Sequence, residues 1–192
     1  MKLSESEKGV LILAAREAIQ SLFLEIISPI IDYTYYPNLK EKRGAFVTLI
    51  QSNKLRGCIG YLQSDMSLFE TVCEAAKQSA VNDPRFPPVT YDEISKIFVE
   101  ISVLSPLEKI SNYEQIELGV HGLMLEEGQY RSVLLPQVAV EHNYNHSQFL
   151  NALCEKAGLP PFAWENDILN IKVFTAEVFS EMGNRKRTYE RI

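Results

Sequence analysis

The feature of this sequence that most limits its fold is a pattern that occurs twice. Each copy has two short β-rich runs joined by a polar turn, then an amphipathic helix, then a longer apolar run. The first copy occupies the ranges 44–50, 55–62, 67–81 and 97–104. The second copy occupies the ranges 122–126, 130–135, 147–157 and 171–179. Two hairpin–helix–strand units predict an α+β fold, in which largely antiparallel sheets have helices packed on one face.

An extra helix is predicted before the repeat. Ser4 and Glu7 have the spacing of a capping box, and apolar residues then recur at intervals of three and four as far as Ile26. We therefore expect an amphipathic helix over about 5–27.

The length of 192 residues suits one domain with its own core, so the fold requires neither a disulfide nor a metal. We expect a single domain over 1–183 with two sub-lobes, at about 40–110 and 119–182. The remaining residues, 184–192, form a basic tail that we expect to pack loosely.

Charge and cysteine usage favour a cytoplasmic protein with no nucleic-acid or membrane partner. The net charge is −6, and most of the chain is more acidic than this because the tail concentrates four cations. Such a body is a poor match for a phosphate backbone. We find no secretory signal and no apolar run of membrane-spanning length. The three cysteines are widely spaced, without a CxxC pair, which is typical of reduced thiols.

The segment LRGCIG, residues 55–60, is the first candidate site. In a strand, Arg56 and Cys58 share one face. Gly57 and Gly60 flank Cys58, and glycine inside a strand indicates a bulge or the close approach of a ligand or another backbone. Arg56 could favour the nucleophilic thiolate of Cys58 or bind an anionic ligand. The alternative is that Cys58 is a small buried residue in a tightly packed hairpin.

The proline-rich segment NDPRFPP, residues 82–88, is the second candidate site. Asp83 can cap local backbone groups, and the prolines restrict the loop. The loop could be a preorganised arm that presents Arg85 to a carboxylate or phosphate. The alternative is a helix stop with a local salt bridge.

The histidines give weaker signals. His121 begins the second hairpin and is a weak candidate for a catalytic base, as is Glu126. His142 and His146 are four residues apart, but HNYNH lacks the glutamate of a HExxH zinc site, so we predict no metal. Common nucleotide-binding motifs are also absent, and we predict no cofactor.

Seven strings spread over most of the chain resemble the AMMECR-type domain family. They are LRGCIG at 55–60, SAVNDPRFPPV at 79–89, VEISVL at 99–104, GVHGL at 119–123, LLPQVAVE at 134–141, KAGLPP at 156–161 and FTAEVFSE at 174–181. The resemblance implies an α+β fold with two sub-lobes and a family without an assigned reaction. Prokaryotic members of this kind resemble protein A of the AmmeMemoRadiSam system, whose neighbours imply a Memo-type protein and a radical SAM enzyme as partners. It also implies a functional site at Arg56, Gly57, Cys58 and Gly60.

Two functions therefore stay open. The first is an accessory or binding protein that uses a groove beside the LRGCIG strand for a partner or a small anionic ligand. The second is a cysteine-dependent enzyme with Cys58 as the nucleophile. Nucleophilic catalysis needs a base within hydrogen-bond reach of the thiol.

Overall fold

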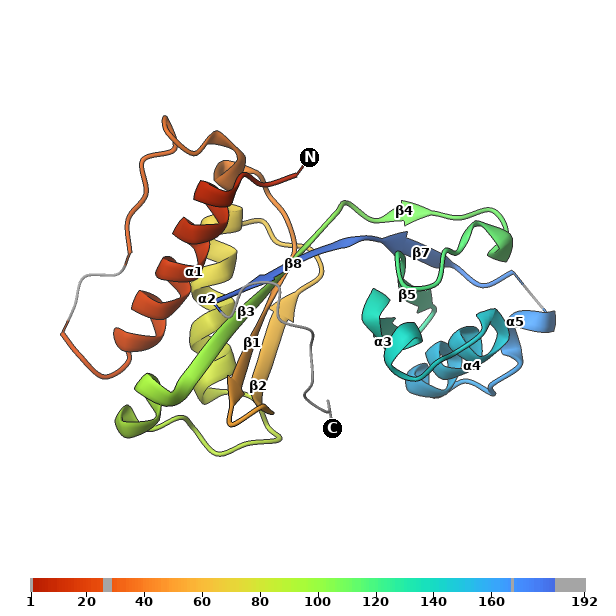
Figure 1. The fold of residues 1–192 in the computed structure, drawn as a ribbon. Coiled ribbons are helices and arrows are strands. Elements are labelled where there is room, and N and C mark those ends of the chain that lie inside the picture. Colours follow the sequence, from red (N-terminus) through yellow and green to blue (C-terminus); the bar gives the residue numbers. More distant parts are fainter. Residues whose placement is uncertain (1, 26–28, 167, 182–192) are drawn as a thin grey trace. The chain divides into compact units, whose positions relative to one another are not determined.

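The computed structural model describes residues 2–25, 29–166 and 168–181. These residues form two compact units (Figure 1). The first unit contains the chain up to Leu104 and again from Glu177, and the second contains Ser105–Ala176. The sequence pattern assigned the chain through residue 182 to the second sub-lobe, whereas the last described strand belongs to the sheet of the first unit.

The first unit is a four-stranded sheet with two helices on one face. Its strands lie in the order β2-β1-β3-β8. Their bounds are β1 Ala45–Gln51, β2 Lys54–Tyr61, β3 Ile97–Leu104 and β8 Ala176–Ser180. Helix α1 (Glu5–Gln20) packs on β3, and α2 (Leu68–Val81) packs on β1 and β2. The core between helices and sheet includes Ala15 and Val72 from the helices and Val47, Leu49 and Ile101 from the strands.

Short 3-10 helices complete the first unit. η1 (Pro37–Lys40) precedes the β1–β2 hairpin, and η2 (Tyr91–Lys96) leads into β3. Both α1 and α2 begin with the capping box that the sequence indicates for α1, with Ser4 and Ser67 as the N-caps.

The second unit repeats the plan of the first. Its sheet has the order β4-β7-β5-β6. The strand bounds are β4 Glu108–Lys109, β5 Gly122–Glu127, β6 Tyr130–Leu134 and β7 Ile171–Phe174. The helices are η3 Tyr113–Gln115, α3 Pro136–Glu141, α4 His146–Ala157 and α5 Ala163–Asn166. Its core is separate from that of the first unit and includes Phe149 and Leu153 of α4 with Leu123 and Ile171 of the sheet.

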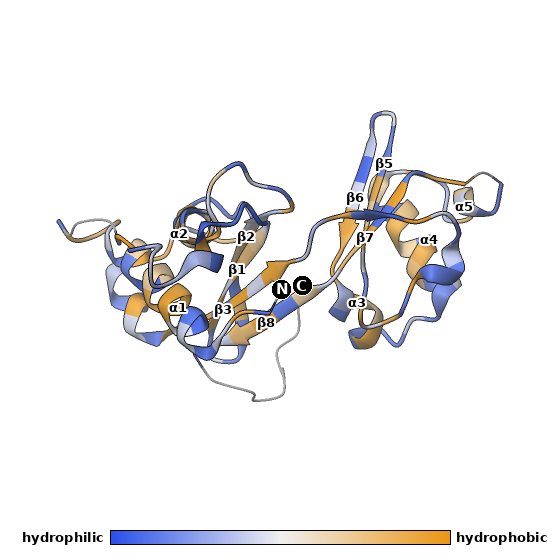
Figure 2. Cartoon of the chain, turned by 90° about the horizontal axis from the view of Figure 1, so that it is seen from above, coloured by the Kyte–Doolittle hydropathy of each residue, from blue (hydrophilic) through white to orange (hydrophobic). Residues whose placement is uncertain are grey.

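The strand order confirms the predicted α+β fold. In each unit the return strand of the hairpin lies at one edge, followed by the first hairpin strand, the closing strand and a fourth strand. That fourth strand comes directly after the closing strand of the other unit: β4 follows β3, and β8 follows β7. In both units the hydrophobic residues concentrate on strands and helices, and the tip of the β5–β6 hairpin is hydrophilic (Figure 2).

Two predicted elements differ from the structure. Helix α1 ends at Gln20, not near 27, because the chain turns at Ser21 and brings Phe23 against the core; residues 26–28 lie outside the described ranges. The predicted closing strand 171–179 is two strands, because the chain changes sheets at Thr175. There the backbone N–H of Ser105 donates to Thr175 O at 2.9 Å.

The other predicted helices and strands agree with the structure to within one or two residues at most ends. The tail predicted over 184–192 lies outside the described residues. Within the described ranges, no helix combines the length and apolarity needed to cross a membrane.

Candidate functional site

The LRGCIG segment forms most of β2, which is one of the two edge strands of the first sheet. A tight turn joins it to β1, with Ser52 and Asn53 both at positive φ (51° and 59°), as a type I′ hairpin turn requires. The pairing register shifts between Leu49 and Ile50, so Arg56 has no partner residue on β1. In a regular strand, Arg56 would pair with a residue of β1. At this bulge Arg56 is the extra, unpaired residue and the strand bends, which changes the direction of its side chain.

The two glycines of the segment are explained by backbone packing. A Cβ added at Gly57 would lie 2.2 Å from the carbonyl oxygen of Ser79, so α2 can approach β2 only because residue 57 has no side chain. A Cβ added at Gly60 would lie 2.4 Å from the carbonyl oxygen of Ala45. The Ser79 hydroxyl uses this closeness: it donates to Val47 O and accepts from the N–H of Ile59, each at 2.7 Å.

Arg56 is directed at η2 and the proline-rich arm. Its Nε and Nη2 donate to the two carboxylate oxygens of Glu93 at 2.8 and 3.1 Å, and its Nη1 donates to Pro87 O at 3.0 Å. These hydrogen bonds hold the pKa of Glu93 at about 2, below its ordinary 4.5. The Arg56 side chain is mostly buried, at 12% exposure. It therefore fastens two segments to β2, and an anionic ligand would have to compete with Glu93 for it.

The proline-rich arm closes over the outer edge of β2 through Asp83 and Arg85. Asp83 accepts the backbone N–H of Cys58 at 2.8 Å, and Arg85 donates to the Cys58 carbonyl at 3.3 Å. Arg85 also binds both Asp83 oxygens, at 3.0 and 2.8 Å. These bonds, led by the one from Arg85, lower the pKa of the buried Asp83 to about 2. We call the segment Asp83–Pro88 the arm. The edge clamp is its set of four hydrogen bonds with β2: Asp83 and Arg85 to the Cys58 backbone, Arg56 to Pro87 O, and Arg56 Nη2 to Pro88 O at 3.4 Å.

The Cys58 thiol has a hydroxyl neighbour. Its Sγ lies 3.3 Å from Thr48 Oγ1, and the residue is partly exposed. Among the described residues, no histidine or carboxylate hydrogen-bonds this sulfur. By comparison, Cys154 is buried, and burial raises the pKa of the partly exposed Cys73 to about 11. The described site thus has a thiol without the contacting base that nucleophilic catalysis needs.

A row of three polar residues crosses the sheet at this point. Thr48 pairs with Cys58 on one side and with Glu100 of β3 on the other. Paired residues on neighbouring strands point to the same face, so Cys58, Thr48 and Glu100 form what we call the polar row. Thr48 and Glu100 are buried. Neither was a candidate from the sequence, although a glutamate in the middle of the apolar run IFVEISVL is a visible signal.

The weaker candidates belong to the second unit. His121 accepts the N–H of Glu117 on its Nδ1 at 3.1 Å, and Glu126 binds Lys172 at 2.7 Å. Their described partners are all residues of the second unit. The His121 ring thus accepts a nearby backbone N–H, and Glu126 forms a partly exposed ion pair.

His142 and His146 have different partners. His142 follows the end of α3 and stacks on Tyr144, with ring centroids 5.1 Å apart. His146 begins α4, and its Nε2 lies 2.9 Å from Ile116 O. In the part of the chain that the structure describes, no three His, Cys, Asp or Glu side chains cluster to hold a metal.

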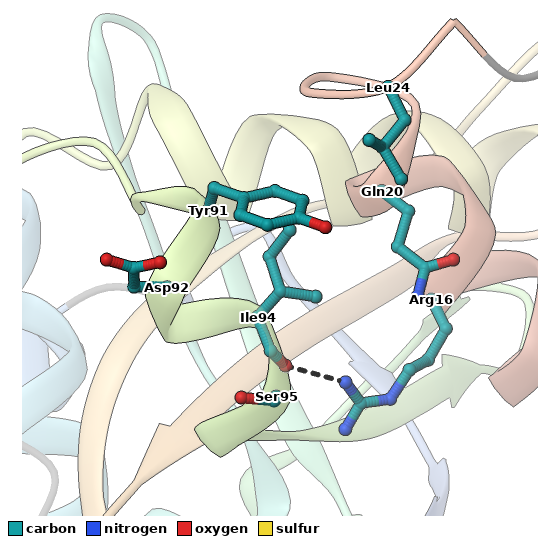
Figure 3. A pocket seen from close by; sticks show the side chains of 7 residues that line it. All are labelled: Arg16, Gln20, Leu24, Tyr91, Asp92, Ile94 and Ser95. Atoms are coloured by element: carbon teal, nitrogen blue, oxygen red, sulfur yellow. Dashed lines mark hydrogen bonds between the residues drawn. The ribbon is translucent and has the colours of Figure 1, made fainter.

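A separate pocket of about 430 Å³ lies between α1 and η2 (Figure 3). Arg16 and Gln20 line it from α1, and Tyr91 and Ile94 line it from η2. The Arg16 guanidinium is already engaged: it donates to Ile94 O at 2.9 Å and to Glu181 Oε2 at 2.7 Å. The helix η2 that lines this pocket also carries Glu93, the partner of Arg56, but none of the lining residues belongs to the edge clamp.

Comparison with known proteins gives consistent matches. A sequence model of the family AMMECR1 matches residues 12–179. The chain is 40% identical to Protein MJ0810 of Methanocaldococcus jannaschii over 199 aligned positions, which cover 100% of the chain and 98% of that relative. It is 44% identical to Protein PF1979 of Pyrococcus furiosus, covering 76% of the chain and 74% of the relative.

A solved structure is also similar over nearly the whole chain. It is the crystal structure of the uncharacterized protein PH0010 from Pyrococcus horikoshii, with a TM-score of 0.86 and 39% identity, covering 95% of each chain.

Proposed function

The chain belongs to the AMMECR1 family, and on that premise we propose that it is a binding protein that acts through protein partners, with the arm and the edge of β2 as its contact surface. One observation carries the proposal: both arginines of the two motifs are bound by carboxylates inside the protein, at Glu93 and Asp83. Such pairs build a rigid surface. They leave the motifs poorly suited to capture a small anion.

The outer side of the arm has the composition of a protein interface. Pro84, Arg85 and Pro87 are exposed, and the Arg85 guanidinium lies 5.5 Å from the centre of the Phe86 ring. Arginine and aromatic side chains are enriched at interface hot spots. Because the edge clamp fixes the backbone beneath them, little ordering entropy is lost when a partner binds.

The partners we propose are those that the family resemblance implies, a Memo-type protein and a radical SAM enzyme. The test is to measure binding of the full-length chain to each of these proteins from the same genome by calorimetry. Phe86→Ala should weaken binding about tenfold, since the substitution removes an interface anchor.

Phe162→Ala is the matched control, because Phe162 is an exposed phenylalanine of the second unit. It should change the dissociation constant less than about twofold. Equal effects of the two substitutions, or no binding by the unaltered chain, would contradict the proposal.

A cysteine-dependent enzyme is the second candidate, favoured by the partly exposed Cys58 thiol beside the Thr48 hydroxyl. The two proposals separate at Cys58→Ser. In a binding protein this substitution should leave partner affinity nearly unchanged, whereas in an enzyme it should abolish turnover of any substrate that is found.

A further inference from the structure

The edge strand β6 of the second unit has a counterpart in the first unit. β6 lies at one edge of its sheet (Figure 2), as β2 does in the first sheet, and a two-residue turn joins each of these strands to its hairpin partner. Counted from the turn, and allowing for the bulge at Arg56, Ser132 is equivalent to Gly57 and Val133 is equivalent to Cys58. The two edge strands can therefore be compared residue by residue.

The outer edge of β6 is formed by the backbone groups of Arg131 and Val133. A two-residue turn places the flanking residues Glu127 and Tyr130 in a hydrogen-bonded pair, and such pairs alternate with non-hydrogen-bonded pairs along an antiparallel ladder. Arg131 and Val133 lie in the non-hydrogen-bonded pairs, so their N–H and C=O groups point away from β5. The Lys156 ammonium agrees with this direction, since it donates to Val133 O at 3.0 Å.

In the first unit the equivalent backbone groups are bound by the arm. Asp83 accepts the N–H of Cys58, and Arg85 donates to the Cys58 carbonyl. In the second unit, the N–H groups of Arg131 and Val133 and the carbonyl of Arg131 have no hydrogen-bond partner among the described residues. An open edge of this kind is a template for pairing with a further strand. Within the described part of the chain, β6 therefore has no counterpart of the arm.

The charged groups at this edge are cations. Arg131 is exposed, and Glu126 opposite it on β5 is bound to Lys172 at 2.7 Å. Lys156 adds a second cation at the carbonyl of Val133, which keeps a lone pair for a further donor. An incoming strand with a carboxylate opposite Arg131 would gain a cross-strand ion pair. A second copy pairing through its own β6 would instead bring two Lys156 ammonium groups to one edge, so the edge favours an acidic partner.

We propose that the outer edge of β6 binds an acidic, extended segment of a partner protein, which adds to the sheet as an antiparallel strand. The backbone of the segment pairs with Arg131 and Val133, and a carboxylate opposite Arg131 binds its guanidinium. Antiparallel pairing fits this sheet, because its described strand pairs are all antiparallel. The surface consists of residues of the second unit, so this inference does not rest on the proposed function.

The test uses the full-length chain and a short peptide of alternating glutamate and valine as the probe. Amide exchange is followed by NMR with and without a saturating amount of the peptide. Exchange of the Arg131 and Val133 amides should slow about tenfold or more, because both N–H groups become bonded to the added strand. The Cys58 amide, which Asp83 already binds, is the internal control and should change less than about twofold. Binding without slower exchange at Arg131 and Val133 would overturn the proposal.

Two N-methylated probes separate strand addition from simple charge attraction, because they have the same charge and composition. Methylation of the valine amides leaves free the peptide edge that places glutamate opposite Arg131. Methylation of the glutamate amides leaves only the pairing with valine opposite Arg131, in which the ion pair cannot form. The second peptide should therefore bind about fivefold more weakly than the first in a calorimetric titration. Equal affinities would overturn the proposal.

Charge reversal on the protein gives an independent result. Arg131→Glu should weaken binding of the glutamate–valine peptide about tenfold and should strengthen binding of a lysine–valine peptide by a similar factor. The matched control is Lys109→Glu on β4, the opposite edge strand of the same sheet, where the residue is also exposed. It should change either affinity less than about twofold.

Three outcomes contradict the proposal. The first is that the glutamate–valine peptide does not bind the unaltered chain, and the second is that Arg131→Glu leaves its affinity unchanged. The third is a concentration-dependent dimer that slows exchange of the Arg131 and Val133 amides without any peptide, since a second copy of the chain would then be the occupant of the edge.

Discussion

The two units share a strand order but differ in how the edge strand of the hairpin is held. In the second unit, β6 is fastened to α4 by single contacts, such as the Ser132 hydroxyl to Leu153 O at 2.7 Å. In the first unit, β2 is held by the edge clamp, by the Ser79 hydroxyl and by close backbone approach at Gly57. The shared strand order therefore does not need many contacts at the edge strand of the hairpin. The additional contacts of β2 mark the first unit as the specialised one.

The largest expected effect is at Gly57, compared with the open position Gly128 of the second unit. Gly57→Ala places a Cβ against a backbone oxygen at 2.2 Å, which only a shift of α2 can relieve, and should destabilise the protein by about 3 kcal/mol. The comparison in the second unit is Gly128→Ala, where φ is 57° but nothing lies within 4 Å of the added atom. Its cost should be about 1 kcal/mol of backbone strain. Urea unfolding of both variants checks the order, and equal losses would show that the α2–β2 contact can relax.

The next effect concerns ion pairs. Asp83→Asn removes the ion pair between Asp83 and Arg85 and weakens the acceptor for the Cys58 N–H. Since Asp83 is buried but Arg85 is 45% exposed, we expect a loss of about 2 kcal/mol. The counterpart is Glu126→Gln in the second unit, whose pair with Lys172 is partly exposed on both sides and should contribute less than about 1 kcal/mol. Thermal unfolding of the two variants measures both losses of stability. A larger loss for Glu126→Gln than for Asp83→Asn would contradict the prediction.

Acid should weaken the first unit more than the second. The native pKa values of Asp83 and Glu93 are about 2, below their ordinary 3.8 and 4.5. Their stabilisation is complete above the ordinary values and is lost as the pH falls from about 5 towards 2. Amide exchange of β2 reports on the first unit, and fluorescence of Trp164, the single tryptophan, reports on the second. Loss of the Trp164 signal before β2 loses protection would contradict this prediction.

The smallest effect concerns thiol reactivity. Cys58 should react with iodoacetamide before Cys73, whose pKa is raised to about 11, and Cys154 should react last because it is buried. Peptide mass spectrometry at neutral pH gives the three rates. A Cys58 that reacts only after denaturation would show a purely structural role.

The fold was largely predictable because it is repeated and strongly patterned. The two helices that follow the hairpins and the strand Ile97–Leu104 have clear periodicities, caps and breakers, and the structure places them as expected. The change of sheet at Thr175 was not predictable, since one continuous apolar run fits one strand as well as two. The end of α1 was missed for a similar reason: the apolar spacing continues beyond Gln20, but tertiary packing of Phe23 draws the chain away.

The candidate site was predictable in its residues but not in its pairings. LRGCIG and NDPRFPP stand out in the sequence, yet nothing in the sequence shows that Arg56 would bind Glu93. Pairings between distant segments depend on tertiary geometry, here on the bulge at Arg56. Thr48 and Glu100 became candidates only once the strand register was known.

The exchange of edge strands has a consequence for how the protein is made. The second unit, Ser105–Ala176, is one uninterrupted stretch, while the first unit needs β8, which is translated after it. On the ribosome the first sheet must therefore wait for its fourth strand until the whole second unit has been made, roughly 4–15 s at ordinary rates of synthesis. During that interval β3 is a temporary free edge, and the later half of the chain can finish folding before the earlier half.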